Sequence, residues 1–555
     1  MPKAAAPETY ESEVLDHLGL VAGMYEELEI GNRLDEHISQ DLTQREVSVG
    51  QAVKAMVLNG LGFVQQSLYL TPQFFKARPT ERLIGKGIRP EHLNDDTLGR
   101  ALDSLYDYGV TELFRDLSAH AAEKLNLAPR FAHLDATSFS THGEYRTGEK
   151  TEEQSAKGKA TGGVIRVRKG YSRDHRPDLN QVVLNLMVEH KAGLPVLMEP
   201  LSGNASDQGS FPELIDRHVD RLQNTHGFDY VVADSALYSS DHIRDLDRNE
   251  VKFITRVPGT LSEAKQAIQA ADPADLKPLA EGYRAGEHVS EYGDVKQRWL
   301  VVWSEAASER AIESATRRRD REHKAEKRRL RELEMREVSC REDAEKALSA
   351  FEEGLTGSTW ANRKVLRAIC FAPDEKKTPV ETEVVNYMLD GRLVPSEVRR
   401  AQLVKKKSHF IVATNELDEE KLSAKELLNG YKGQSKVERG FRFLKDQQFL
   451  ASSLFLESEE RIMALLMVMT LCLLVYAALQ YRIRKGLLDE ERSYPDQKGK
   501  PTQCPTARWV FQSFEGIHVL HTGQQDIVLN VRGHHRTVVS ILGPEYERLY
   551  VSHPT

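Results

Sequence analysis

Two short stretches, Phe131-Ala132-His133-Leu134-Asp135 and Tyr230-Val231-Val232-Ala233-Asp234, decide the fold of this chain. Each is typical of a short β-strand that ends on an aspartate. An acid at a strand end leaves the sheet where backbone pairing stops and a ligand can approach. A strand-end aspartate also commonly caps the next turn, so the meaning of the pair depends on the elements around it.

The elements around these two stretches predict a mixed sheet covered by helices. β-Rich runs at residues 181–188 and 194–198 follow the first aspartate, and residues 163–169 also alternate as a strand would. An amphipathic helix is expected at 211–222, a second helix at 242–246 and a further strand at 251–257. The order of three strands, helix, strand, helix and strand is that of an RNase H-like fold within a multidomain α/β protein.

The rest of the chain has a different residue pattern. Residues 1–128 are helical in pattern and fit a helix-turn-helix module or a plain bundle equally. Strands are expected within 287–303 and 364–388, with a long charged helix at 305–353 that we interpret as a solvated arm rather than a DNA contact. The chain thus has five predicted segments: a helical domain at 1–128, whose helix-turn-helix alternative would bind DNA ends, the core at 129–258, an insertion at 259–404, the rest of the core at 405–485, and a linker with a β-rich unit (527–529 and 538–541) at 486–555.

The composition of the 555 residues sets limits on function. The net charge of −8 excludes a protein that coats DNA through overall charge, although a local basic groove still attracts phosphate. The four cysteines form no CxxC pair, so neither a zinc site nor a disulfide framework is indicated. The first residues lack the apolar core of a signal peptide, and we expect a cytoplasmic protein. Residues 462–479 are almost wholly apolar; a buried helix is favoured over a single membrane span.

A third acid lies in the stretch from Tyr431 to Lys445, within a helix expected at 421–445. Tyr431, Glu438 and Lys445 are seven residues apart, which is close to two helical turns. Gln434 lies one turn before Glu438 and Arg442 one turn after it, so one face carries an aromatic ring, an amide, a carboxylate and two cations. The alternative is an ordinary amphipathic helix with Glu–Arg pairing.

Three carboxylates on such elements suit phosphodiester chemistry. Two divalent ions about 3.5–4 Å apart can stabilise charge on the attacking and the leaving oxygen. Mg²⁺ prefers oxygen ligands and retains several waters, and Mn²⁺ is the alternative ion. We expect two Mg²⁺ ions, with Asp135 bridging both, Asp234 holding one and Glu438 the other.

At these residues the sequence resembles the DDE transposases of bacterial insertion sequences, in the IS-four superfamily and its IS-sixteen-thirty-four branch. The characteristic motif of the family is Tyr-x2-Arg-x3-Glu-x6-Lys, where x is any residue. Tyr431, Glu438 and Lys445 match at that spacing, whereas Gln434 stands where the family has Arg. Residues 170–178 and 203–207 also resemble family segments, and the long interruption before Glu438 fits the β-rich insertion of this group.

The resemblance implies a transposase that binds the terminal inverted repeats of its element, cuts DNA at the ends and joins 3′-hydroxyls to target DNA. Pairing two ends implies at least a homodimer in the working complex. Tyr431 and Lys445 are implied DNA contacts, and we add Gln434 and Arg442 from the same face. Trp299 and Trp303 are candidates for stacking a flipped base, but core packing is the favoured interpretation.

A basic run beside the first strand is a further expected DNA contact, favoured over a solvated hairpin face: Arg166, Arg168, Lys169, Arg173, His175 and Arg176. His133, two residues before Asp135, is interpreted as a packing residue. Two other functions stay open: an RNase H-like nuclease without strand transfer, and a catalytically silent DNA-binding relative.

Overall fold

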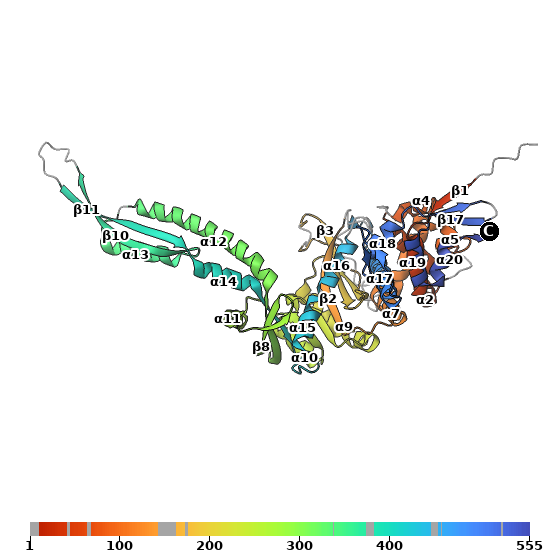
Figure 1. The fold of residues 1–555 in the computed structure, drawn as a ribbon, viewed down its shortest axis with the longest axis horizontal. Coiled ribbons are helices and arrows are strands. Elements are labelled where there is room, and N and C mark those ends of the chain that lie inside the picture. Colours follow the sequence, from red (N-terminus) through yellow and green to blue (C-terminus); the bar gives the residue numbers. More distant parts are fainter. Residues whose placement is uncertain are drawn as a thin grey trace, which may run out of the picture. The chain divides into compact units, whose positions relative to one another are not determined.

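The computed structural model of the protein describes residues 10–40, 45–63, 68–141, 163–171, 176–336, 338–372, 382–445, 453–454, 456, 458–522 and 525–554. The chain folds into two compact units. Unit 1 contains Met1–Thr255, Gly293–Val295 and Asn429–Thr555, and unit 2 contains Arg256–Tyr292 and Lys296–Leu428. Figure 1 shows the elements along the chain.

Unit 1 is built on a mixed sheet with the strand order β4-β3-β2-β5-β6. Strands β2 (Phe131–Thr141), β3 (Asn180–Glu189) and β4 (Pro195–Ser202) form an antiparallel meander. Strand β5 (Tyr230–Ala233) pairs parallel to β2, and β6 (Lys252–Arg256) pairs parallel to β5. The connections are α9 (Asp207–His226) and, after the turn η3 (Ser235–Leu237), α10 (Ser240–Arg248). This arrangement confirms the predicted RNase H-like α/β core.

Many of the other elements of unit 1 pack around one buried helix. Helix α17 (Glu459–Asp489) is the one helix among the described residues that is long and apolar enough to cross a membrane. Its apolar window is 89% buried against the protein, as predicted for a core helix. It packs against β4 and against helices from both ends of the chain: α1 (Leu18–Glu27), α3 (Val49–Leu61), α6 (Asp95–Tyr108), α7 (Val110–Lys124), α18 (Ala507–Ser513) and α19 (Gly533–Leu542).

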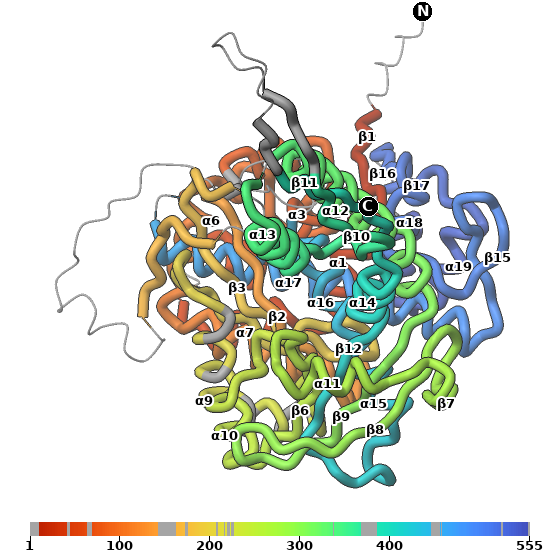
Figure 2. Tube along the Cα trace, turned by 90° about the vertical axis from the view of Figure 1, so that its left-hand side faces the viewer, coloured from red at the N-terminus to blue at the C-terminus, as the bar shows by residue number. Residues whose placement is uncertain are grey.

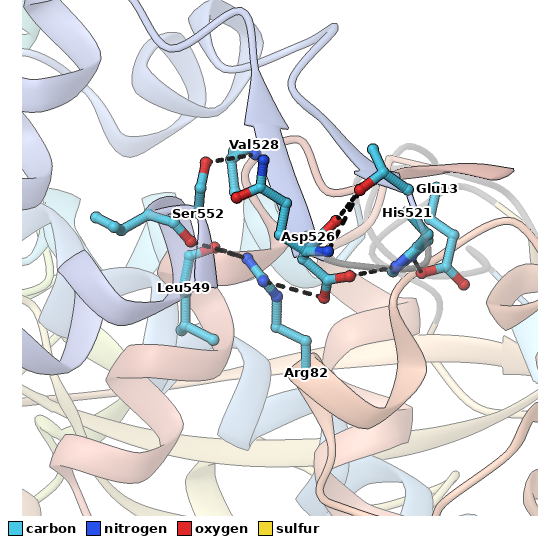
Figure 3. A network of polar contacts seen from close by, with 10 residues as sticks. Glu13, Arg82, His521, Asp526, Val528, Leu549 and Ser552 are labelled. Carbon is cyan, nitrogen blue, oxygen red and sulfur yellow. Dashed lines mark hydrogen bonds and ion pairs between the residues drawn. The ribbon is translucent and has the colours of Figure 1, made fainter. Parts of the chain in front are cut away.

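The two ends of the chain share structure as well. Strand β1 (Glu11–Val14) pairs with β16 (His518–His521) in a sheet that continues through β17 (Gln525–Leu529) and β18 (His553–Pro554). The His521 ring joins this sheet by contacts of 2.7 Å to Glu13 and to Asp526, and Arg82 reaches Asp526 and the Leu549 carbonyl (Figure 3). The N-terminal helices and the C-terminal segment therefore belong to one core, and the predicted boundaries at 128 and 485 do not separate compact units.

The smaller elements of unit 1 complete this core. They are α2 (Ile30–His37), η1 (Leu68–Leu70), α4 (Thr71–Phe75), α5 (Thr80–Leu83), η2 (Pro90–Leu93), β13 (Ser453–Leu454), β14 (Tyr494–Pro495), β15 (Pro501–Thr502) and α20 (Pro544–Tyr550).

Unit 2 combines a four-strand run with a long hairpin. Strands β7 (Lys277–Ala280), β8 (Tyr283–Tyr292), β9 (Val295–Ser304) and β12 (His409–Thr414) are neighbours in the order β12-β9-β8-β7, with α11 (Ser262–Ala270) and α14 (Glu397–Ser408) packed on β12. Strands β10 (Ser358–Ala372) and β11 (Thr382–Pro395) form the hairpin, which contacts α12 (Glu305–Glu334) and α13 (Arg341–Glu353), as Figure 2 shows. Trp299 is fully buried, as its predicted packing role requires, and Trp303 is half-buried.

Several local predictions are wrong. The charged helix at 305–353 is two helices, because Cys340 starts a new one by accepting the Asp343 N–H at its Sγ. It is also not wholly solvated: Glu326 of α12 is buried and accepts N–H bonds from Thr356 and Gly357. Residues 538–541 belong to helix α19 rather than to a strand. Residues 163–169 form no strand, and only Arg168 bridges to Gln181.

His17, just before α1, gives unit 1 a pH-dependent stability. Its ring is buried, stacks on Phe511 with ring centroids 4.4 Å apart, and donates from Nε2 to the Leu61 carbonyl at 2.8 Å. Burial lowers the pKa of His17 to about 4. The unfolded chain therefore binds more protons than the folded one between this pKa and the ordinary value of about 6.5, and stability falls as the pH drops through that window.

We expect His17 alone to reduce the free energy of unfolding by about 2 kcal/mol between pH 7 and pH 5. The His17→Gln variant keeps an amide donor for Leu61 but does not titrate, so its denaturant midpoint should change less over this range. Chemical unfolding of both proteins at the two pH values measures the difference. Equal pH dependence of the two proteins would contradict the assignment.

Candidate functional site

The register of β2 and β5 places Asp135 and Asp234 side by side. Leu134 pairs with Ala233 in the parallel ladder, and each aspartate is the next residue. Neighbouring strands are about 4.8 Å apart, and paired residues of a parallel ladder share a face. Asp234 keeps an extended backbone, with φ −73° and ψ −173°, so the two carboxylates leave the sheet on one face. Sequence reasoning predicted both residues, and the sheet brings them together.

Both carboxylates are held by local backbone groups. Asp135 Oδ1 accepts the Ala136 N–H at 2.8 Å, and Asp234 Oδ1 accepts the Ala236 N–H at 2.9 Å. Asp234 thus caps the turn η3, as strand-end aspartates commonly do. The buried Thr255 hydroxyl on β6 donates to the Asp234 carbonyl at 2.7 Å. This support by Thr255 was missed by the sequence reasoning, because only the β5–β6 register reveals it.

The predicted helix at 421–445 is interrupted. It is two helices, α15 (Ala424–Lys432) and α16 (Ser435–Leu444), separated at Gly433 and Gln434. A Cβ at Gly433 would lie 2.7 Å from two atoms of the His133 ring, so only glycine lets the chain approach β2 this closely. The consequence is that Tyr431 and Glu438 lie on different helices.

Gln434 joins this break to the strand that carries Asp135. Its side-chain amide is buried and donates to the carbonyl oxygen of Leu134 at 2.8 Å. Beside it the His133 ring is fully buried, as predicted for a packing residue, and burial lowers the pKa of His133 to about 3, which keeps the ring neutral. Gln434 therefore serves a contact inside the protein, and its predicted DNA contact stays a prediction.

Helix α16 crosses the face of the sheet on which Asp135 lies. Leu186 of β3 is the ladder partner of Asp135, and paired residues of an antiparallel ladder share a face. A Cβ at Gly440 would lie 3.8 Å from Leu186 and 3.1 Å from Leu473 of α17, so α16 passes between β3 and α17. Further along, the Lys445 ammonium lies 5.8 Å from the centre of the Phe139 ring. Glu438 lies between Gln434 and Gly440, on the exposed side of α16.

The donor set fits a hard divalent cation, but only in part. Asp135 and Asp234 offer carboxylate oxygens on one face, which is the chemistry that Mg²⁺ and Mn²⁺ prefer. Among the residues that the structure describes, no three His, Cys, Asp or Glu side chains are grouped closely enough to hold a metal ion. The strand register therefore sets two carboxylates on one face, and no third such side chain is grouped with them among the described residues.

The other predicted DNA contacts lie in different surroundings. Arg442 is exposed, and Tyr431 and Lys445 are half-buried. Arg176 is exposed and pairs with Asp178 at 2.8 Å. Arg173 and His175 lie outside the described residues. The first residues of the segments 170–178 and 203–207 meet in space, because a Cβ at Gly170 would lie 2.0 Å from the Gly203 carbonyl oxygen.

Removing the Gln434 amide should destabilise the site and the fold together. In Gln434→Ala the buried carbonyl of Leu134 loses a donor, and we expect the free energy of unfolding to fall by about 1–3 kcal/mol. Ser435→Ala, at the exposed neighbour, should change it by less than about 0.5 kcal/mol. Denaturant unfolding of both variants measures this, and equal stabilities would mean that the bond to Leu134 contributes nothing.

Comparison with known proteins gives two family matches. A family described as a domain of unknown function, DUF4277, matches residues 10–119, and one described as the transposase DDE domain matches residues 127–475. No curated protein matches this chain. A solved piggyBac transposase synaptic complex with hairpin DNA is similar, with a TM-score of 0.37 and 9% identity over 91% of this chain and 82% of that chain. Since the DDE match spans more than half of the 555 residues, the chain belongs to the transposase DDE domain family.

Proposed function

We propose that this transposase binds the terminal inverted repeats of its own element, cuts DNA at the ends and joins the 3′-hydroxyls to target DNA. The observation that carries the proposal is the ladder pairing of Leu134 with Ala233, which sets Asp135 and Asp234 on one face beneath α16. The finer placement, in the IS-sixteen-thirty-four branch of the IS-four superfamily, rests on the spacing of Tyr431, Glu438 and Lys445.

Asp135, Asp234 and Glu438 would hold the two divalent ions. When bound, the ions supply Lewis-acid stabilisation of charge on the attacking and leaving oxygens. The two aspartates are already oriented, by the Ala136 and Ala236 N–H groups. Glu438 stands on a helix that is held at Gln434 by the bond to Leu134, so a small movement of α16 changes the distance between its carboxylate and the pair.

The exposed side of α16 is the surface that would face DNA. Arg442 lies one turn after Glu438 and is exposed, and Lys445 lies near the end of the same helix. Cations beside the reacting phosphate position the DNA backbone without reading its sequence. Cutting and joining both ends of the element requires two such sites, so the proposed working complex contains at least a homodimer of this chain.

Joining of a labelled element end to plasmid DNA, with and without Mg²⁺, tests the proposed function. The probe carries the inverted repeats that flank the coding region. We expect Mg²⁺-dependent joining by the wild type and a loss of at least about a thousandfold in Asp135→Asn and Glu438→Gln, because each removes a ligand whose charge stabilisation amounts to several kcal/mol. Asp241→Asn, at an exposed acid of α10, is the matched control and should retain activity.

The remaining outcomes decide between the alternatives. Cleavage without joining would replace the transposase proposal by an RNase H-like nuclease. Binding of the ends without cleavage, by wild type and variants alike, would identify a catalytically silent relative. Full joining by Glu438→Gln with none by Asp135→Asn would mean that the third carboxylate is another residue.

A further inference from the structure

Unit 2 contains a strongly basic cavity that the catalytic site does not use. It has a volume of about 640 Å³ and lies among α11, α14, α12 and the start of β12. Seven cationic side chains line it together with His409, and no aspartate or glutamate does among the residues that the structure describes. The cations of this basic cavity are Arg256, Lys265, Arg318, Arg399, Lys405, Lys406 and Lys407.

Among the described residues, the ion pairs of this cavity place one carboxylate against two of its seven cations. Arg318 and Arg399 share one carboxylate, that of Glu322, at 2.9 and 3.3 Å. Two of the lysines use neutral acceptors, which leave the charge in place: Lys405 donates to the Gln269 carbonyl and Lys407 to the Ser314 hydroxyl. The basic cavity therefore holds an excess of positive charge in a concave surface, where the field is focused.

A structural explanation covers only part of the cluster. Lys405, Lys406 and Lys407 occupy the last turn of α14, where cations interact favourably with the helix dipole. That effect does not account for Lys265 on α11 or for Arg256 at the end of β6, which face the same cavity from other elements. Because like charges repel, gathering these side chains costs free energy that a bound anion would recover.

We propose that the basic cavity binds the phosphodiester backbone of DNA, as a second anchoring surface apart from the carboxylate site. The volume is too large for a single phosphate and accommodates several linked ones. Lysine ammonium groups are point charges without fixed bidentate geometry, which suits backbone contacts that ignore sequence. This inference rests on the proposed function for DNA as the partner; a free polyphosphate such as a nucleotide would offer the same chemistry.

The salt dependence of DNA binding by the full chain tests this surface. The probe is a labelled duplex that lacks the element ends. Each lost phosphate contact reduces the slope of log K against log salt by about 0.9, so Lys265→Gln/Lys406→Gln should reduce it by about 1.8 and weaken binding at 0.1 M salt by about tenfold or more. Both lysines are exposed, so the variant should fold, which thermal unfolding checks.

The matched control is Lys324→Gln/Lys327→Gln, which removes the same charge from exposed positions on α12 outside the cavity. A slope unchanged from wild type in the cavity variant, or reduced equally in the control, would overturn the inference. ATP is titrated in parallel. Tight ATP binding that only the cavity variant loses, with DNA binding unaltered, would also overturn it in favour of a small polyphosphate ligand.

The joining assay separates this inference from the proposed function. In the cavity variant, the concentration of end DNA needed for half-maximal joining should rise because phosphate contacts are lost, whereas the requirement for Mg²⁺ should stay because the carboxylates are untouched. Normal joining by the cavity variant, together with an unchanged salt slope, would reject DNA binding by the cavity and leave the transposase proposal intact. If the wild type neither binds nor joins DNA, the proposed function is wrong, and so is the assignment of DNA as the ligand of the cavity.

Discussion

Burial of helix α17 is the constraint on which unit 1 depends. Within its 31 residues, the stretch 462–479 is almost wholly apolar on all sides, so this part must be surrounded by protein. Each fully buried leucine or methionine along it contributes about 1.5–3 kcal/mol relative to exposure. The surrounding layer comes from both ends of the chain and from β4. Because no single segment is large enough to cover α17, the N-terminal helices and the C-terminal segment fold around it as one core.

Helix α17 also contacts the helix that carries Glu438. Leu473 of α17 and Leu186 of β3 lie on two sides of α16 at Gly440, where an added Cβ would press on Leu473 at 3.1 Å and meet Leu186 at an ordinary contact distance of 3.8 Å. At its N-terminal end α16 follows Gln434, which bonds to the Leu134 carbonyl. The position of Glu438, between these two contacts, therefore depends on packing in the hydrophobic core.

The sequence predicted the mixed sheet of unit 1 because strand pattern and strand-end acids are local features, as at Asp135 and Asp234. It failed where a distant contact overrides local preference. Val538, Val539 and Ile541 favour a strand, but they are buried on a helix that packs against α17, where Ile541 meets Gly486. Likewise, the family pattern has arginine where Gln434 stands. No local signal showed that this amide would bond to a carbonyl 300 residues away.

The net charge of this chain does not predict whether it binds a polyanion such as DNA. The whole chain carries −8, yet charge of one sign is concentrated at particular sites. The two aspartates lie on one sheet face, where their negative charge opposes the approach of a phosphate unless cations are bound between them. Seven cations of unit 2 line a cavity without acidic lining among the described residues. At physiological salt, charge interactions decay within about 8 Å, so the local lining of a surface, rather than the net charge of the chain, decides whether it attracts phosphate. The proposed anchoring surface would therefore place phosphate affinity where no carboxylate lines the cavity among the described residues.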